Sequence, residues 1–151
     1  MQNRKTRKLP LIITALLMIF IFIQSALPAD LSQQESNVIV LMLSRFLSVD
    51  GEGLSFAVRK CAHFTEYMLL GMSLYMTVRE YLPAIEVLSA VQPVSWLIGT
   101  LYAVTDEFHQ RFVPGRSCEI RDILIDSCGV AAGVLIMTVI RGIRGRQEGA
   151  I

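Results

Sequence analysis

The sequence predicts an all-α membrane protein, a bundle of four transmembrane helices with ionisable side chains gathered at one membrane face. Hydrophobic residues make up 53% of the chain and charged residues only 18%, whereas soluble domains usually carry about a quarter charged residues. A helix needs about 20 mostly apolar residues to cross the hydrocarbon core, and four segments approach that length. Most of the remaining charge lies at the ends of these segments.

The four predicted spans form a single domain over residues 1–151. They cover approximately residues 9–27, 61–78, 87–104 and 123–140. The first follows a basic start and also resembles a secretory signal, with conceivable cleavage after Ala26 or Ala29. Its apolar run is longer than a usual signal core, and the large residues Gln24 and Leu27 stand where a small one is preferred. We therefore expect this segment to be retained as a span.

Basic residues in the short loops predict that both termini face the cytoplasm. The two tails and the connection between the second and third spans carry eight Lys and Arg, against six in the other loops. Residues 28–60 and 105–121 then face outward. Within the first outer loop, Ser32 to Glu35 has the spacing of a capping box and precedes an apolar stretch. That stretch is either a short amphipathic helix at the membrane interface or a hydrophobic loop packed on the bundle.

Charge and cysteine content argue against two other classes of protein. The net charge of +1 is too small to suggest nucleic-acid binding, and no basic stripe with interleaved aromatic residues is present. Cys61, Cys118 and Cys128 are too few and too irregularly spaced for a disulfide scaffold. We expect them to be unreactive thiols in or near the bilayer.

The start of the second span has one polar face. At about 100° per residue, Lys60, His63, Glu66 and Tyr67 fall within a sector of roughly 120°, and Arg59 joins them. Separately, Lys60 could reach the interface and Tyr67 could belong to an aromatic belt. Glu66 is harder to dismiss, because a carboxylate below the headgroups costs several kcal/mol unless it is paired or hydrated.

The third span ends in a second polar group. Asp106 and Gln110 are four residues apart and share a helix face, and Glu107 and His109 lie beside them. Pro114-Gly115 then occupies the central positions of a type II turn. Such a turn returns the chain to the same membrane face and presents Arg116 there.

The fourth span begins with a stripe that faces the bundle interior. Asp122, Asp126, Gly129 and Gly133 fall within about 60° of each other on a helical wheel. Gly129 and Gly133 form a GxxxG motif, which lets two helices approach closely. The two aspartates should therefore face inward as well.

These groups lie at the same ends of their spans, so they can converge at the outer face. Intramembrane ionisable residues are functional-site candidates by default. The alternative is that their pairing serves only to hold the bundle together. The convergent set comprises Lys60, His63, Glu66, Tyr67, Asp106, Glu107, Gln110, Arg116, Asp122 and Asp126.

The same residues, in this order and spacing, resemble the VanZ-like family, and the likeness covers nearly the whole chain. It includes the stretch from Gln24 to Pro28, the run from Arg59 to Tyr67, and Pro114-Gly115-Arg116. The resemblance implies a bacterial cytoplasmic-membrane protein of the cell envelope, because the founding member is linked to teicoplanin resistance. The family is also proposed to contain enzymes that act on lipid or lipid-linked headgroups.

A phosphoester hydrolase or transferase on lipid headgroups is the first functional hypothesis. His63 would act as base or nucleophile, oriented by one of the three aspartates. Arg116 and Lys60 would bind phosphate oxygens, and Tyr67 would donate to the leaving oxygen. We predict the catalytic residues His63, Tyr67, Asp106, Glu107, Asp122 and Asp126, and the substrate-binding residues Lys60, Gln110 and Arg116.

Two further hypotheses need no catalysis. The same pocket could recognise a lipid, a glycopeptide or an envelope partner, or the charges could only lock an accessory membrane protein. We expect no cofactor. A divalent cation among the carboxylates of Asp106, Glu107, Asp122 and Asp126 is conceivable but not favoured, because Lys60 and Arg116 already neutralise them. The expected partners are membrane lipids or lipid-linked envelope precursors, and not nucleic acid.

Overall fold

The computed structural model describes residues 4–44, 51–82 and 87–148. Within those residues the chain forms helices joined by loops, without a β-strand, which confirms the all-α class. The helices are α1 (Arg4–Ser25), α2 (Ala29–Ser44), α3 (Gly51–Tyr81), α4 (Val87–Gln110) and α5 (Ile120–Glu148).

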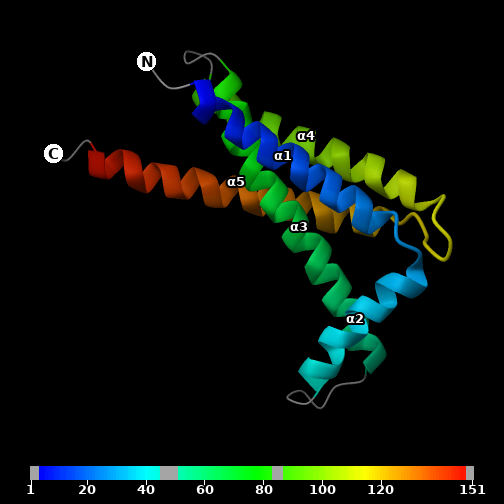
Figure 1. Cartoon of the computed structure of the whole chain (residues 1–151). Coiled ribbons are helices and arrows are strands. Elements are labelled where there is room, and N and C mark those ends of the chain that lie inside the picture. Colours follow the sequence, from blue (N-terminus) through cyan, green and yellow to red (C-terminus); the bar gives the residue numbers. More distant parts are fainter. Residues whose placement is uncertain (1–3, 45–50, 83–86, 149–151) are drawn as a thin grey trace.

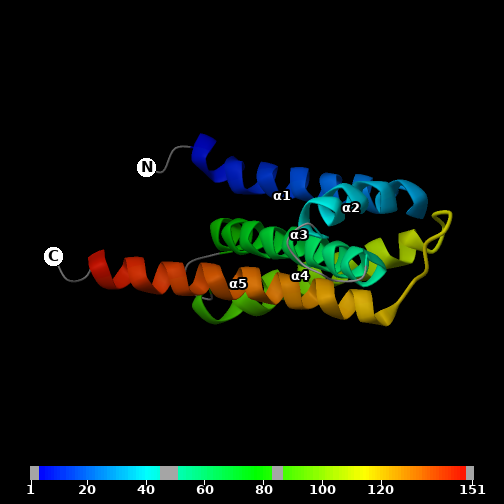
Figure 2. The same cartoon turned by 90° about the horizontal axis from the view of Figure 1, so that it is seen from below.

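Helix α3 lies at the centre of the arrangement and packs against each of the other four helices. Helix α3 crosses α5 (Figure 1). Helices α1 and α4 run alongside each other (Figure 1), and both contact α3. In Figures 1 and 2, α1 begins and α5 ends at one end of the molecule, opposite the loop between α4 and α5. With 31 residues, α3 is about 46 Å long at 1.5 Å per residue. This length exceeds the roughly 30 Å hydrocarbon core. The first part of α3 extends past the other three long helices and contacts α2 (Figure 1).

The closest helix contact joins α3 to α5 through the predicted glycine stripe. A Cβ atom at Gly133 would collide with the Met68 carbonyl oxygen, and one at Gly129 would come within 2.5 Å of the Phe64 carbonyl oxygen. Only residues without a side chain permit this approach. The inward orientation of the stripe is confirmed, and Asp126 on the same face is 1% exposed.

The outer faces of the bundle are strongly apolar. On α1, Leu16 and Ile23 are 60% and 56% exposed, while Ile21 is completely buried. Two helices of the described chain, over Lys8–Ser25 and Ile120–Gln147, are long and apolar enough to cross a membrane. Large exposed apolar faces on such helices indicate a surface solvated by lipid. The predicted four-span arrangement goes beyond this finding.

The predicted first outer loop is mostly helical, and its helices begin earlier than expected. Helix α2 begins at Ala29, so Ser32 lies inside it and the predicted capping-box start is wrong. The Pro28 carbonyl accepts the N–H groups of Leu31 and Ser32, each at 3.1 Å, and proline has a backbone angle suited to a helix start. Helix α3 begins at Gly51, ten residues before the predicted span at Cys61.

Candidate functional site

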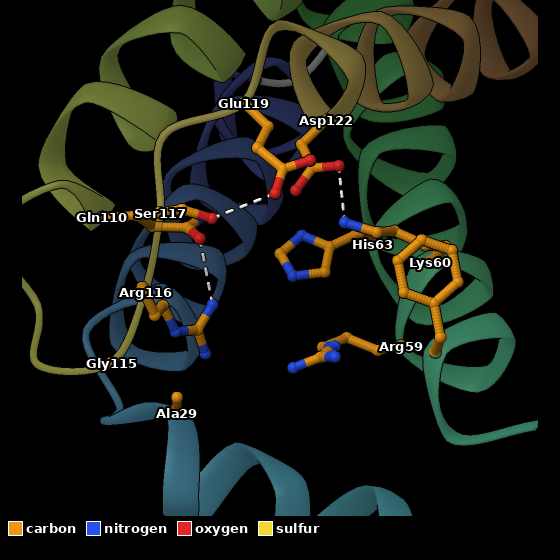
Figure 3. Close-up of a pocket in the computed structure, with 11 residues that line it drawn as sticks. Ala29, Arg59, Lys60, His63, Gln110, Gly115, Arg116, Ser117, Glu119 and Asp122 are labelled. Atoms are coloured by element: carbon orange, nitrogen blue, oxygen red, sulfur yellow. Dashed lines mark hydrogen bonds and ion pairs between the residues drawn. The ribbon is translucent and has the colours of Figure 1, made fainter. Parts of the chain in front are cut away.

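A polar pocket of about 220 Å³ lies at the end of the bundle, where α2 and α3 meet the loop between α4 and α5. Figure 3 shows basic, acidic and amide side chains from these elements pointing toward one space. The predicted residues that line it are Lys60, His63, Gln110, Arg116 and Asp122.

The turn that presents Arg116 has the predicted type II geometry. Gly115 has a φ of +75°, and the Arg116 N–H donates to the Val113 carbonyl at 3.2 Å, as a type II turn requires. The Ala29 N–H donates to the Pro114 carbonyl at 3.2 Å, which docks the turn on the start of α2. A side chain at Gly115 would also press on Ala29.

The Arg116 guanidinium joins the end of α1 to the pocket. Its Nε donates to the Leu27 carbonyl at 2.9 Å and its Nη2 to the Gln24 carbonyl at 3.2 Å. Its Nη1 donates to Gln110 Oε1 at 3.1 Å. Arginine side chains commonly cap helix ends in this way. Because a guanidinium has five N–H donors, Arg116 caps α1 and still lines the pocket.

A second arginine, Arg59, faces Arg116 across the pocket (Figure 3). Burial lowers the pKa of Arg116, and the positive charge of Arg59 adds to that effect. In the described part of the chain, the Arg59 guanidinium has no hydrogen bond or ion pair. The predicted binding set omitted Arg59. The signal for it was its position four residues before His63, on the same helix face.

Lys60 and His63 contact different aspartates of α5. Lys60 Nζ donates to Asp122 Oδ1 at 2.5 Å, with the two side chains 19% and 21% exposed. His63 Nδ1 lies 3.9 Å from Asp126 Oδ1, longer than a hydrogen bond. Of the three predicted orienting aspartates, Asp126 is therefore the one with a close contact to the imidazole.

Three buried polar residues, Tyr67, Asp106 and Asp126, lie behind the lining residues His63 and Gln110 without lining the pocket themselves. Each of the three is at most 2% exposed. Among the described residues, one carboxylate oxygen of Asp126 has no hydrogen-bond partner, whereas the Tyr67 hydroxyl interacts with the Asp106 carboxylate. Asp106 Oδ2 accepts the Gln110 amide at 3.2 Å, which confirms that these two residues share a face. Buried polar groups are normally paired, and an unpaired group in a native structure is a candidate for a functional role.

Glu107 holds the loop instead of lining the pocket. Its side chain is 1% exposed, and its Oε1 accepts the Glu119 N–H at 2.7 Å. Glu119 directly precedes α5, so the carboxylate lies at the positive end of that helix. Burial raises the pKa of Glu107, and the hydrogen bond from Glu119 partly opposes that rise.

Two residues that the helix geometry associated with the site lie at its margins. Glu66 is close enough to Arg116 for its charge to raise the pKa of that guanidinium, against the effect of burial. His109 packs on Phe22 of α1, with ring centroids 4.6 Å apart. Within residues 4–44, 51–82 and 87–148, no group of three or more His, Cys, Asp or Glu side chains is placed to hold a metal ion.

Comparison with known proteins adds one decisive finding. The family model described as VanZ/LLP1 matches residues 10–141. The chain belongs to the VanZ/LLP1 family. No curated protein and no solved structure matches the chain. The matched range contains the whole pocket, from Ala29 to Asp122. Membership in the VanZ/LLP1 family, together with the two apolar helices, indicates a membrane-associated envelope protein of a kind linked to glycopeptide resistance.

Proposed function

We propose that the pocket binds the phosphate of a lipid or lipid-linked headgroup and acts on its phosphoester bond. In this proposal α1, α3, α4 and α5 cross the bacterial cytoplasmic membrane, both termini are cytoplasmic, and the pocket opens at the outer leaflet. The observation that carries the proposal is the pair of facing guanidinium groups, Arg59 and Arg116.

Two facing cations favour an anion between them. Two like charges repel each other, so the two guanidinium groups are most stable in this position when a negatively charged group binds between them. Arg59 has all its donors available within the described chain, and Arg116 keeps those that the α1 carbonyls and Gln110 do not use. Guanidinium groups match phosphate oxygens in pairs. Lys60 adds charge nearby, although Asp122 already neutralises part of it.

His63 is the group placed to perform chemistry on that phosphate. It lines the same pocket, and an imidazole ring can both accept and donate a proton. In the proposed hydrolysis, His63 takes a proton from the attacking water as oxygen bonds to phosphorus. The phosphorus–oxygen bond to the alcohol then breaks, and the alkoxide takes a proton from water at the pocket mouth. The hydroxide that remains takes the proton from the His63 imidazolium, which returns to its neutral form. Asp126 stabilises the protonated imidazole.

A non-catalytic binding protein is the second candidate. The separation of 3.9 Å between His63 Nδ1 and Asp126 Oδ1 favours it, because an unoriented base is a weaker catalyst. Such a protein would hold the headgroup, and any change in teicoplanin tolerance would follow from that binding alone.

Purified protein incubated with radiolabelled phospholipids or lipid-linked wall precursors tests both candidates. We expect headgroup release or exchange, with Arg59→Gln weakening substrate binding and His63→Gln abolishing turnover while binding is kept. Arg121→Gln is the matched control, because Arg121 is exposed on α5 and does not line the pocket. Binding without turnover would select the second candidate. Binding that Arg59→Gln leaves unchanged would overturn the proposed site.

Teicoplanin tolerance of cells that express each variant gives an independent readout. If headgroup chemistry underlies tolerance, His63→Gln removes it at an unchanged level of membrane protein. If binding alone underlies it, Arg59→Gln removes it and His63→Gln does not. Loss of protein accumulation in both variants would instead favour a purely structural role for the charges.

A further inference from the structure

An apolar groove runs along the outside of the bundle between α4 and α5. It has a volume of about 450 Å³. Trp96 and Leu135 in its walls are 44% and 63% exposed. The apolar lining consists of Pro93, Trp96, Ala131, Val134 and Leu135.

The groove continues into a second cavity that carries two cations. This cavity of about 330 Å³ includes Arg79 of α3 and Arg141 of α5 in its lining. Gln92 and Thr138 line both spaces, so the apolar groove and the basic cavity adjoin. The two cations of the basic cavity come from the last turn of α3 and from the second half of α5. These parts of the two helices lie away from the loop between α4 and α5 (Figure 1).

The distances along α5 match one leaflet of a bilayer. The residues of α5 that line the two spaces follow the spacing of a single helix face. They are Ala131, Val134, Leu135, Thr138 and Arg141. Ten residues separate Ala131 from Arg141, which corresponds to about 15 Å. This is half of the roughly 30 Å hydrocarbon core. An apolar stripe of this length that ends in a cation has the dimensions of one acyl chain and its headgroup.

The two arginines supply the charge that selects a headgroup. Among the described residues, neither Arg79 nor Arg141 has a hydrogen bond or ion pair. Basic pockets between membrane helices bind anionic lipid headgroups. Gln92 and Thr138 sit where the apolar and basic parts join. The Thr138 hydroxyl already donates to the Val134 carbonyl at 2.9 Å, so the Gln92 amide is the group that can donate to a lipid ester oxygen.

We propose that this groove is a binding site for an anionic phospholipid, separate from the polar pocket. One acyl chain lies against Trp96, Ala131 and Leu135, and the phosphate lies between Arg79 and Arg141. The lipid comes from the leaflet at the end of the bundle where α1 begins. The site requires a membrane location but does not depend on catalysis at the pocket.

Trp96 makes the proposal directly measurable, because the chain contains one tryptophan. The full chain is placed in phosphatidylcholine vesicles that contain a minor fraction of lipid brominated on its acyl chains. Bromine quenches tryptophan fluorescence on contact, so quenching reports which lipid occupies the groove. We expect brominated phosphatidylglycerol to occupy the site with roughly tenfold preference over brominated phosphatidylcholine. Equal quenching by the two lipids would overturn the proposal.

Two sets of variants separate the headgroup site from general lipid contact. The double variant Arg79→Gln/Arg141→Gln should remove the preference for phosphatidylglycerol, and Arg144→Gln should retain it, because Arg144 is exposed and lines neither cavity. Ala131→Leu should fill the groove and reduce quenching by both lipids. A preference that survives the double variant would contradict the assignment. Loss of headgroup turnover at the polar pocket would leave this result unaffected.

Discussion

Glu107 shows how a buried carboxyl group can link two elements at a cost that depends on pH. Burial raises its pKa above the ordinary value of 4.5. A carboxyl whose pKa is raised by folding contributes stability that is fully present below the unfolded pKa. That stability is lost as pH rises through the folded pKa. Burial makes the charged form of Glu107 the less favourable one in this site.

We therefore expect the free energy of unfolding of the wild type to fall, relative to Glu107→Gln, as pH rises above about 4.5. The glutamine is neutral throughout, and its side-chain oxygen can still accept the Glu119 N–H. The measurement is the thermal midpoint of both proteins in one detergent across that pH range. A difference between the two midpoints that does not change with pH would contradict the argument.

Arg59 and Arg116 carry equal charge but have different roles. Arg116 makes three hydrogen bonds, two of them to carbonyl groups at the end of α1. Arg59 makes none among the described residues. The residue types alone do not separate a structural arginine from a binding one. The distinction depends on where α1 ends relative to the turn at Gly115, which is a long-range property of the fold.

At the scale of the elements, the closeness of α3 and α5 depends on Gly133. A methyl group there would meet the Met68 carbonyl oxygen, whereas nothing lies within 4 Å of a Cβ at Gly145. We expect Gly133→Ala to lower the free energy of unfolding by about 2 kcal/mol or more. Gly145→Ala, the matched control on the same helix, should be neutral or stabilising by up to about 1 kcal/mol.

Unfolding in a graded series of denaturing detergent measures both glycine variants. The same preparation should show whether headgroup binding changes with Gly133→Ala, because Asp122 and Asp126 lie on the same helix face. Equal stability of the two variants would mean that α3 and α5 can separate without cost, contrary to the packing described.

A second prediction at this scale concerns Arg116, because its hydrogen bonds join the end of α1 to the loop between α4 and α5. Lysine keeps the positive charge, but it lacks the planar guanidinium group that lets arginine donate to three acceptors at once. Hydrogen bonds from charged groups contribute about 1.5–3 kcal/mol each, so we expect Arg116→Lys to cost about 2 kcal/mol. Arg121→Lys, at an exposed position of α5, should have no measurable effect. Matching thermal midpoints for the two variants would contradict the role of Arg116 as a cap.

Local patterns predicted the parts of the site that one helix or one turn determines. The stripe from Asp122 to Gly133 and the Pro114-Gly115 turn were confirmed, because helix periodicity and glycine conformation are properties of adjacent residues. The hydrogen bonds of Arg116 to Gln24 and Leu27 were not predicted. They join residues about ninety positions apart in the chain, and no local pattern encodes such a pairing. The early start of α3 was also missed, because polar residues before Lys60 interrupt the apolar run.

At the scale of the whole molecule, the polar pocket and the basic cavity lie toward opposite ends of one bundle. The pocket includes residues of the loop between α4 and α5, and the basic cavity is lined by the second half of α5. That loop and the end of α5 lie at opposite ends of the molecule (Figures 1 and 2). This polarity gives the two ends different chemistry. One end presents mixed charges around a histidine, and the other presents arginines beside an apolar stripe. Which end faces outward then decides which leaflet each site can reach.

Native Cys118 provides the test of that orientation, because it is exposed in the loop beside the pocket. In a Cys61→Ser/Cys128→Ser variant it is the single thiol of the chain. If the pocket faces outward, a membrane-impermeant maleimide labels Cys118 in intact cells. The matched probe is Gln147→Cys in a chain without native cysteines, at the opposite end of the bundle near the finish of α5. We expect that position to react only after the cells are permeabilised, since basic residues hold that end in the cytoplasm. The reverse pattern would place the pocket inside the cell and exclude action on outer-leaflet headgroups.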